Sequence, residues 1–438
     1  MRTVLIALTA LIVSAWGIDL TFSSPPNGSL PWVLRQEGMY LSGLLSIAMM
    51  SLATFLAARP VWLEGPLGGL DKMYRTHKWA GILAVGFAAV HWLLEMSDDL
   101  LKAMFGREGR IPKENYTGLL DVLRDLAEDM GEWAIYAVLA MLAITLWKRF
   151  PYRAWRFLHR AMPVLYLALV FHAALLAPAD YWGQPVGAVL ALLFGAGIYG
   201  SVLALTGRIG RSRRATATIT AVEHPSPEVV AIRCRLDRDW QAHRPGQFAF
   251  VTFDKMEGAH PFTIASADRG DETISFQIKA LGDYTRELAD RIRLGQEVQI
   301  EGPYGRFDIA RLDRKTRQIW IAGGIGITPF LAWLESLQAH PEQAHADLHY
   351  WTRNPTCDPF IERLKSLCAT LPGIRLHTHG SEPSEVLNAT RLMIAKDGRR
   401  PTEFWFCGPQ GLAMRLKKEL KLLGLVRLRF HQEAFEMR

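Results

Sequence analysis

The sequence predicts a multidomain fold: a six-helix transmembrane bundle, then an antiparallel β-barrel, then a Rossmann-like α/β domain. Three observations lead to this prediction. Hydrophobic runs lie almost wholly before Arg208, short β-rich runs alternate with turn residues from Ala215 to about Ala310, and strands alternate with helices from Arg317 onward. The expected boundaries are 1–208, 209–312 and 313–438. A chain of 438 residues with 50% hydrophobic content and a mean hydropathy of +0.07 fits a membrane part fused to a soluble part.

Six hydrophobic runs are each roughly 17 to 24 residues long, which is enough to cross about 30 Å of hydrocarbon as helices. We place these spans at 3–19, 37–59, 77–96, 132–149, 159–177 and 183–206. A cleavable signal peptide is the rival interpretation of residues 1–19, because Met1 and Arg2 precede an apolar run that ends in small residues. The polar interval 97–131 is expected to be a loop with short amphipathic helices.

Basic residues predict the orientation in the membrane. The loop between spans four and five, "WKRFPYRAWRFLHR", has no acid, and a second basic group follows span six. The cations of the two segments are Lys148, Arg149, Arg153, Arg156 and Arg160, then Arg208, Arg211, Arg213 and Arg214. The positive-inside rule makes both cytoplasmic, with the N-terminus and everything beyond Arg208. These loops account for the net charge of +7, so no nucleic-acid partner is expected.

Cysteine usage indicates neither a disulfide framework nor a zinc site. Only Cys234, Cys357, Cys368 and Cys407 occur, all in the second half, without metal-ligand spacing.

Four histidines lie within the third and fifth spans, where an unpartnered imidazole would be costly. His77 and His91 are 14 residues apart, and His159 and His172 are 13 apart, roughly 20 Å along each helix. His77 and His159 lie at the cytoplasmic ends, and His91 and His172 near the outer ends. Two levels of paired imidazoles suggest two bis-histidine haems stacked across the bilayer. The alternative is that these residues pack helices or lie at the interface.

The helical phase of the two pairs differs. Fourteen residues return a side chain to within about 40° of the same face, whereas thirteen leave it about 140° away on an ideal helix. Either Pro163 kinks span five and alters the phase, or the two haems are rotated relative to one another. Phe87 and Tyr166 lie between the histidines of their spans. Each either fills the gap between the haems or packs helices.

The predicted barrel contains motifs suited to a flavin. "HPFTIAS" at 260–266 places an imidazole, a proline and a hydroxyl on a strand that can hold an isoalloxazine and phosphates. "LGDYTREL" at 281–288 places Gly282 and Thr285 at a helix start, where backbone donors favour a pyrophosphate. "EGPYGRF" at 301–307 is expected to close the barrel with a tight turn.

The α/β region contains motifs suited to a dinucleotide. "RQIWIAGGIGITPFLAWLESL" predicts a buried strand, a glycine turn and an amphipathic helix, which lets a phosphate approach backbone amides. "LHYWTRN" at 348–354 and "EFWFCGPQGL" at 403–412 predict further strands whose ends carry Thr352, Arg353, Cys407, Gly408 and Pro409. Open α/β sheets bind ligands at such carboxyl ends.

The order "HPFT", "GxxT", "GPYG", "GGxGxTP", "CGP" resembles the ferredoxin–NADP reductase superfamily. With the four-histidine membrane half, nearly the whole chain resembles the NADPH oxidase and ferric reductase family. The resemblance implies an oxidoreductase in which His77 with His159, and His91 with His172, ligate an inner and an outer b-type haem. It also implies that FAD is held by His260, Pro261, Phe262 and Thr263 and its pyrophosphate by Gly282 and Thr285. Gly323, Gly324, Gly326, Thr328 and Pro329 would hold the nicotinamide dinucleotide.

The same resemblance implies that Cys407 faces the nicotinamide, and that Phe435 stacks on the flavin with Glu433 nearby, unless Phe435 is a core residue. Thr352 and Arg353 suit a 2′-phosphate and favour NADPH over NADH. Arg353 is equally compatible with a surface position.

Electron transfer from cytosolic NAD(P)H through FAD and two haems to an outer acceptor is the implied function. Oxygen giving superoxide, a ferric chelate and a periplasmic redox protein are the candidate acceptors. Superoxide-forming relatives would have an arginine in the outer half of span two, where this chain has only Arg35 nearby. No calcium loop or proline-rich tail indicates a regulatory subunit, and the compact design suggests a bacterial inner membrane. The alternative is a tethered flavin reductase whose electrons leave on the cytoplasmic side.

Overall fold

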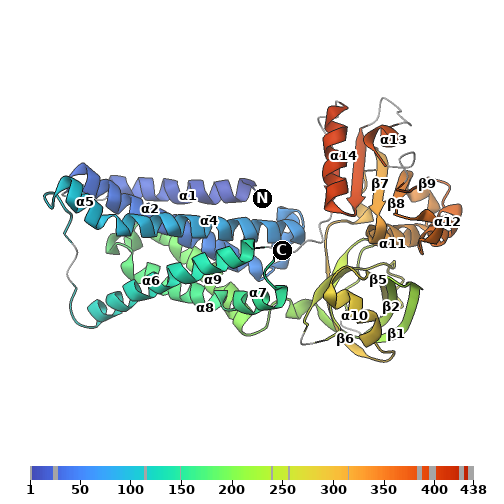
Figure 1. The fold of residues 1–438 in the computed structure, drawn as a ribbon, viewed down its shortest axis with the longest axis horizontal. Helices are drawn as coiled ribbons and strands as arrows, with labels where there is room; N and C mark the ends of the chain where they lie inside the picture. Colours follow the sequence, from blue (N-terminus) through green and yellow to red (C-terminus); the bar gives the residue numbers. More distant parts are fainter. Residues whose placement is uncertain are drawn as a thin grey trace. The chain divides into compact units, whose positions relative to one another are not determined.

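A computed structural model describes residues 2–22, 28–112, 116–147, 149–237, 240–254, 257–313, 315–381, 387–393, 401–423 and 429–432. The chain forms two compact units, Met1–Ile209 and Gly210–Arg438. The first is helical, and the second contains two β-sheets (Figure 1).

Six helical segments of the first unit are long and apolar enough to cross a membrane, which confirms the predicted six spans. They are α1 (Arg2–Phe22), α2 (Leu30–Ala57), α4 (Leu70–Met96), α6 (Leu119–Leu146), α7 (Tyr152–His159) with α8 (Met162–Leu176), and α9 (Pro185–Leu205). Short helices α3 (Val61–Leu67), α5 (Asp98–Phe105) and η1 (Ala179–Gly183) connect them.

Four of the six spans begin at least seven residues before their predicted starts, namely α2, α4, α6, and α7 with α8. The prediction of a loop with short helices over 97–131 holds for α5 but is wrong from Leu119, where α6 already begins. The first turns of α6 carry exposed acids such as Asp121 and Asp125, together with the half-buried Arg124 and the fully buried Ala127. They therefore form an amphipathic helix that hydropathy alone does not detect.

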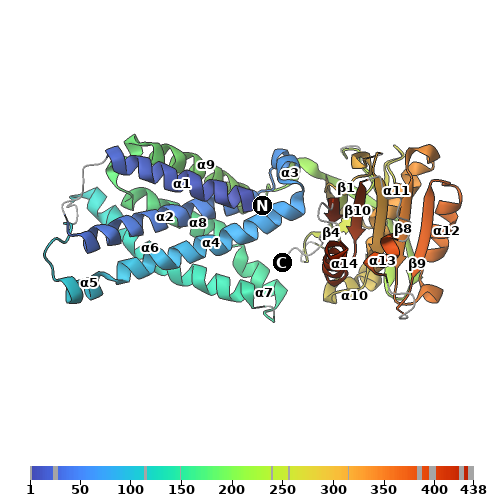
Figure 2. The same cartoon turned by 90° about the horizontal axis from the view of Figure 1, so that it is seen from above.

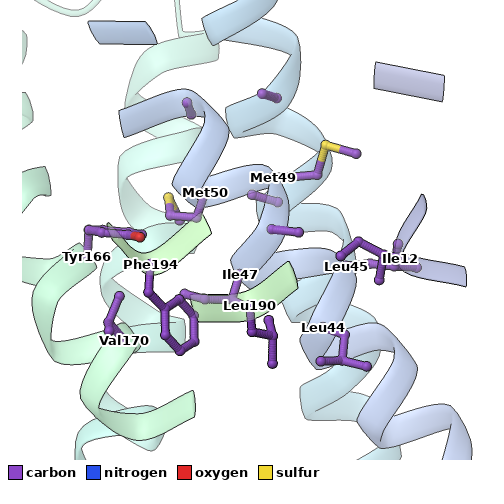
Figure 3. Close-up of a cluster of buried hydrophobic side chains, with 14 of the residues drawn as sticks. Ile12, Leu44, Leu45, Ile47, Met49, Met50, Tyr166, Val170, Leu190 and Phe194 are labelled. Atoms are coloured by element: carbon purple, nitrogen blue, oxygen red, sulfur yellow. The ribbon is translucent and has the colours of Figure 1, made fainter. Parts of the chain in front are cut away.

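Apolar side chains from α1, α2, α4, α6, α8 and α9 form one core in this unit. Helices α2 and α4 lie side by side along most of their length (Figures 1 and 2). Tyr166, Val170, Leu190 and Phe194 line one side of the core, where α8 and α9 meet α2 (Figure 3). The helix pairs α2/α4 and α6/α8 therefore position three of the four histidines, and α7 carries the fourth, His159.

The fifth span is interrupted directly after His159. Ala161 N donates to Leu158 O at 3.0 Å, an i to i−3 bond typical of a tight 3₁₀ turn, and α8 restarts at Met162. Pro163 explains the break, because it lacks an N–H and its ring disfavours helical continuation before it. A 3₁₀ turn rotates by about 120° per residue instead of about 100°. The interruption therefore moves His159 and His172 towards a common face, as a kink at Pro163 was expected to do.

The second unit begins with a six-stranded antiparallel sheet in the order β4-β3-β6-β1-β2-β5. Its elements are β1 (Arg214–Ser226), β2 (Val229–Leu236), β3 (Phe248–Thr252), β4 (His260–Thr263), β5 (Thr273–Lys279) and β6 (Glu297–Tyr304), with α10 (Asp283–Arg291). An antiparallel bridge between Ile264 and Phe276 joins the two edge strands, so the sheet closes as predicted. The "GPY" residues are still part of β6, and the turn comes at Gly305, whose φ of 101° requires glycine.

A five-stranded parallel sheet follows, in the order β11-β10-β7-β8-β9. The strands are β7 (Arg317–Gly323), β8 (Ala346–Trp351), β9 (Ile374–His379), β10 (Thr402–Cys407) and β11 (Arg429–Gln432). Alternate residues face opposite layers, as expected for strands buried on both sides. Trp320 and Trp405 face α11 (Thr328–Leu337) and α12 (Ile361–Ala369), while neighbours such as Ile321 face α13 (Ala389–Met393) and α14 (Gln410–Leu422).

Candidate redox-cofactor sites

The inner pair, His77 on α4 and His159 at the end of α7, has ring centres 6.0 Å apart and ring planes at 83°. The outer pair, His91 on α4 and His172 on α8, has ring centres 6.3 Å apart and planes at 86°. The structure thus brings together the two pairs that the sequence predicted, each at one level of the bundle.

The spacing within each pair fits one metal ion between the rings. Two imidazoles on opposite sides of a metal, each with a metal–nitrogen bond of about 2 Å, have ring centres roughly 6 Å apart. In the described parts of the chain, no group of three or more His, Cys, Asp or Glu side chains could hold a bare metal ion. A haem supplies its own four nitrogens and needs only two axial ligands, so the residues fit a bis-histidine haem at each level.

Backbone carbonyls orient three of the four rings. Nδ1 of His77 lies 2.8 Å from Ala53 O, and Nδ1 of His91 lies 2.8 Å from Met39 O, both on α2. Nδ1 of His172 lies 2.7 Å from Ala127 O on α6. A carbonyl only accepts, so each ring donates from Nδ1 and leaves Nε2 for the metal, the usual arrangement of metal-binding histidines.

Two glycines make room for the outer pair. A Cβ at Gly43 would lie 3.1 Å from Nδ1 of His91, and a Cβ at Gly131 would lie 2.4 Å from Cε1 of His172. Any side chain at Gly131 would therefore displace the His172 ring. At the outer level, the neighbouring residues therefore orient both imidazole rings and leave little space around them.

Tyr166 lies in the packed core and is 1% exposed. Its hydroxyl is 2.9 Å from Ser51 Oγ, and a Cβ at Gly197 would lie 2.0 Å from that hydroxyl. Phe87 packs against the same core. These contacts give Tyr166 a packing role, one of the two roles that the sequence left open.

The four residues His260, Pro261, Phe262 and Thr263 form strand β4 at the edge of the barrel. The His260 ring stacks on Tyr284 of α10 with centres 4.2 Å apart. Phe262 lies in edge or tilted contact with Phe253 and Phe276, and Thr263 is buried. The flavin motif is therefore fixed against both the barrel core and α10.

Gly282 and Thr285 lie at the start of α10, as predicted. Thr285 Oγ1 accepts from Gly282 N at 3.0 Å and from Leu281 N at 2.9 Å, so this hydroxyl caps the helix. Beside it, a cavity of about 370 Å³ is lined by Phe253, Asp254, Tyr284, Leu288, Arg291, Ile292 and Gln296. Burial, with nearby Glu257 and Asp254, raises the pKa of Tyr284 to about 12, so its phenol stays neutral.

The glycine turn after β7 touches the loop after β10. A Cβ at Gly326 would lie 2.3 Å from Cys407 O, and a Cβ at Gly323 would lie 2.8 Å from the Pro409 ring. Gly324 has a φ of 54°, which favours glycine. Thr328 Oγ1 donates to Ile325 O at 3.0 Å, and Pro329 occupies the first turn of α11. These residues form a tight strand–turn–helix at the carboxyl edge of the sheet.

Cys407 is fully buried in the sheet core, while Gly408 is half-buried and Pro409 is exposed. A second cavity, of about 300 Å³, opens at this edge and is lined by Trp351, Ser381, Pro409, Gly411, Leu412 and Arg415. Strands β8, β9 and β10 all end here, so this cavity lies where an open α/β sheet binds its ligand. Arg415, a cation on the wall, was not predicted.

Thr352 and Arg353 follow β8, but their side chains differ in how accessible they are to a ligand. The Thr352 hydroxyl donates to Asp358 Oδ2 at 2.6 Å and is buried, whereas Arg353 is exposed. Glu433 and Phe435 lie outside the described residues. The preceding strand β11 pairs Gln432 with Phe406, so the chain leaves the sheet at the same carboxyl edge.

Sequence reasoning missed several groups that shape these sites. The carbonyls of Met39, Ala53 and Ala127 have no signature in residue type, although the 14-residue separation of Met39 and Ala53 matches that of His77 and His91. The sequence does not distinguish Gly43 and Gly131 from other glycines, because their role depends on a histidine of another helix that lies beside each of them.

Residues 42–170 match the family described as ferric reductase like transmembrane component, and residues 214–308 match the family described as FAD-binding domain. A vanillate O-demethylase oxidoreductase from Pseudomonas sp. is 30% identical over 34% of this chain and 45% of its own length. A flavohemoprotein from Pseudomonas putida is 26% identical over 44% of this chain and 50% of its own length. The chain thus spans about half the length of the curated relatives it matches.

Among solved structures, a flavohemoglobin from Malassezia yamatoensis is similar in fold, with a TM-score of 0.51 and 16% identity over 94% of this chain and 100% of that chain. The two family matches, in this order, confirm the resemblance predicted from the motifs.

Proposed function

For this integral membrane oxidoreductase, which joins a ferric-reductase-like transmembrane domain to an FAD-binding domain, we propose electron transfer across the bilayer. Electrons pass from NAD(P)H through FAD and two b-type haems to an acceptor on the opposite side. The dehydrogenase half and the N-terminus lie in the cytoplasm of a bacterial cell, because the basic loops precede and follow the last two spans.

The observation that carries this proposal is the geometry of the two histidine pairs. Both pairs have the ring spacing for one iron. Helix α4 carries one histidine of each pair, and the partners lie on the successive helices α7 and α8 of the fifth span. A single pair would suit a haem sensor or anchor, whereas two levels suit a path through the bilayer. When bound, haem would supply one-electron exchange, and FAD would supply the conversion of a hydride pair into single electrons.

The protein's own residues supply binding and orientation. His260, Pro261, Phe262 and Thr263 hold the flavin, with Gly282 and Thr285 at its pyrophosphate. The turn of Gly323, Gly324, Gly326, Thr328 and Pro329, with Gly408 and Pro409, holds the nicotinamide dinucleotide beside Cys407. Arg353, exposed at the end of β8, favours NADPH by pairing with a 2′-phosphate.

Oxygen, giving superoxide, is the acceptor we propose first, since it needs no docking surface. One observation favours the alternative, a ferric chelate or a periplasmic redox protein. Arg35 lies inside the outer part of α2, because this helix begins at Leu30 and not at the expected residue 37. Its guanidinium donates at 2.9 Å to both the carboxylate and the carbonyl of Glu95. This pairing reduces the positive charge available to an oxygen anion.

The deciding experiment is NADPH-driven reduction of cytochrome c by the purified, FAD-loaded and haem-loaded chain. It is run with and without superoxide dismutase, in air and under argon. Loss of the signal with dismutase or argon supports an oxidase. Persistence under argon contradicts oxygen as the obligatory acceptor and supports direct transfer to an external acceptor. Failure to reduce any acceptor despite bound FAD contradicts the proposed pathway.

A further inference from the structure

The inner pair differs from the outer pair in how one of its rings is held. Nδ1 of His159 is buried and has no hydrogen-bond partner among the described residues. Each of the other three histidines has its Nδ1 within 2.8 Å of a backbone carbonyl. His159 therefore lacks the contact that fixes ring orientation at most metal-binding histidines.

At His159, an aromatic contact restricts the orientation of the ring instead. The Trp155 ring stacks on the His159 ring with centres 4.9 Å apart and planes at 18°. The two residues are four positions apart on α7, which places them on the same helix face one turn apart. A stacked indole restricts rotation of the imidazole, although it gives no hydrogen bond to Nδ1.

Trp155 is itself anchored to the neighbouring helix. Its Nε1 donates to Thr145 Oγ1 on α6 at 3.0 Å. The anchor matters because α7 ends at His159, so the imidazole lies at a helix terminus beside the interrupted turn. The chain of contacts runs from Thr145 through Trp155 to His159.

We infer that Trp155 is a positioning residue for the inner haem, holding His159 in its axial orientation by ring stacking in place of a hydrogen bond. The inference rests on the proposed function, because it needs an iron between His77 and His159. It makes His159 the weakest-held of the four axial ligands and the one that detaches when its support is removed.

The test uses the full-length, haem-loaded protein and carbon monoxide, which binds ferrous haem only where an axial ligand has detached. Trp155→Leu removes the stack, Trp155→Phe keeps an aromatic ring, and Trp147→Leu is the matched control. Trp147 is a half-exposed tryptophan near the end of α6 that packs on Phe150 instead of a histidine. Dithionite-reduced samples are compared by carbon monoxide difference spectra, haem content per FAD and rescue with millimolar imidazole.

We expect wild type, Trp155→Phe and Trp147→Leu to bind no carbon monoxide. Trp155→Leu should bind it at up to one haem per chain, with affinity for that haem reduced about tenfold or more, the effect typical of lost supporting contacts. Imidazole should restore the six-coordinate spectrum. Equal spectra for Trp155→Leu and Trp147→Leu, or no rescue, overturn the inference.

Two further outcomes separate this inference from the proposed function. A wild-type protein that lacks two six-coordinate haems overturns both. If Trp155→Leu loses both haems together, the deciding variant is Thr145→Val. This variant removes the hydrogen bond to Trp155 Nε1 but keeps the indole ring. Carbon monoxide binding by Thr145→Val supports the inference, and its absence overturns it.

Discussion

The side chains and carbonyls around each histidine determine how firmly it is oriented. At the outer level both rings donate to carbonyls, and glycines leave the space the rings occupy. Axial ligands fixed in this way need little reorganisation when they bind iron. The outer site should therefore respond sharply to small changes in packing.

Gly131→Ala should displace the His172 ring, because the added Cβ would lie 2.4 Å from Cε1 and the ring cannot move without losing its bond to Ala127 O. We expect loss of about half the haem absorbance per FAD, with the inner haem retained. Gly86→Ala on α4 is the control, since a Cβ there meets nothing within 4 Å. Two unchanged haem signals in Gly131→Ala would contradict the geometry at the outer level.

We expect His349 to give the second unit a pH-dependent stability. Burial, with nearby His377 and His379, lowers the pKa of His349 to about 3, and its Nδ1 lies 3.0 Å from His379 Nε2. Between pH 6.5 and pH 3 the unfolded chain binds a proton at this position and the folded chain does not. Stability from His349 is therefore complete above pH 6.5 and is lost as the pH falls towards 3.

We expect the wild-type chain to lose about 1 kcal/mol of stability from this residue between pH 7.0 and pH 5.5. His349→Phe, which keeps an aromatic ring between two stacked imidazoles, should lose correspondingly less over the same interval. Urea midpoints followed by flavin fluorescence measure both chains. Equal pH dependence would show that His349 is not protonated on unfolding in this range.

At the scale of elements, the break between α7 and α8 sets the relative direction of His159 and His172. On a continuous helix these rings would face about 140° apart, yet both lie opposite histidines of the same straight helix α4. The tight turn beside Pro163 supplies part of the extra rotation, about 20° for each residue of the turn. The break thus reduces the mismatch between the two spacings locally, beside Pro163.

Pro163→Ala should allow α7 to continue into α8, since alanine restores the missing N–H and favours the helix interior by about 3 kcal/mol over proline. We expect one of the two haems to be lost from the purified protein, as judged by haem content per FAD and the reduced spectrum. Pro185→Ala, at the first turn of α9, should leave both haems in place. Retention of two unaltered haems would show that the break does not depend on Pro163.

At the scale of the whole molecule, the two histidine levels matter because, in the proposed pathway, electrons would have to pass both to cross the membrane. Replacing His91 and His172 together by leucine should abolish reduction of an impermeant acceptor outside right-side-out cells or vesicles, by at least tenfold. Reduction of a dye on the nucleotide side should continue, because FAD lies in the other unit. A tethered flavin reductase would show no change on either side, which would exclude transfer through the outer pair.

Local patterns in the sequence determined most of the architecture. Runs of apolar residues specified six spans, and alternating strands bounded by turns specified the barrel and the parallel sheet. The spacings of His77 with His91 and of His159 with His172 already placed four imidazoles at two levels. These features follow from periodicity along the chain, which needs no knowledge of distant neighbours.

Contacts between distant segments were decided only by the tertiary structure. Met39, Ala53 and Ala127 orient histidines through carbonyls that every residue has, and Gly131 matters only because His172 lies against it. The sequence suggested a Thr352 free to grip a phosphate, but the fold places Asp358 within 2.6 Å of its hydroxyl. Such partners come from separate helices and strands, so they depend on packing geometry and leave no regular spacing in the sequence.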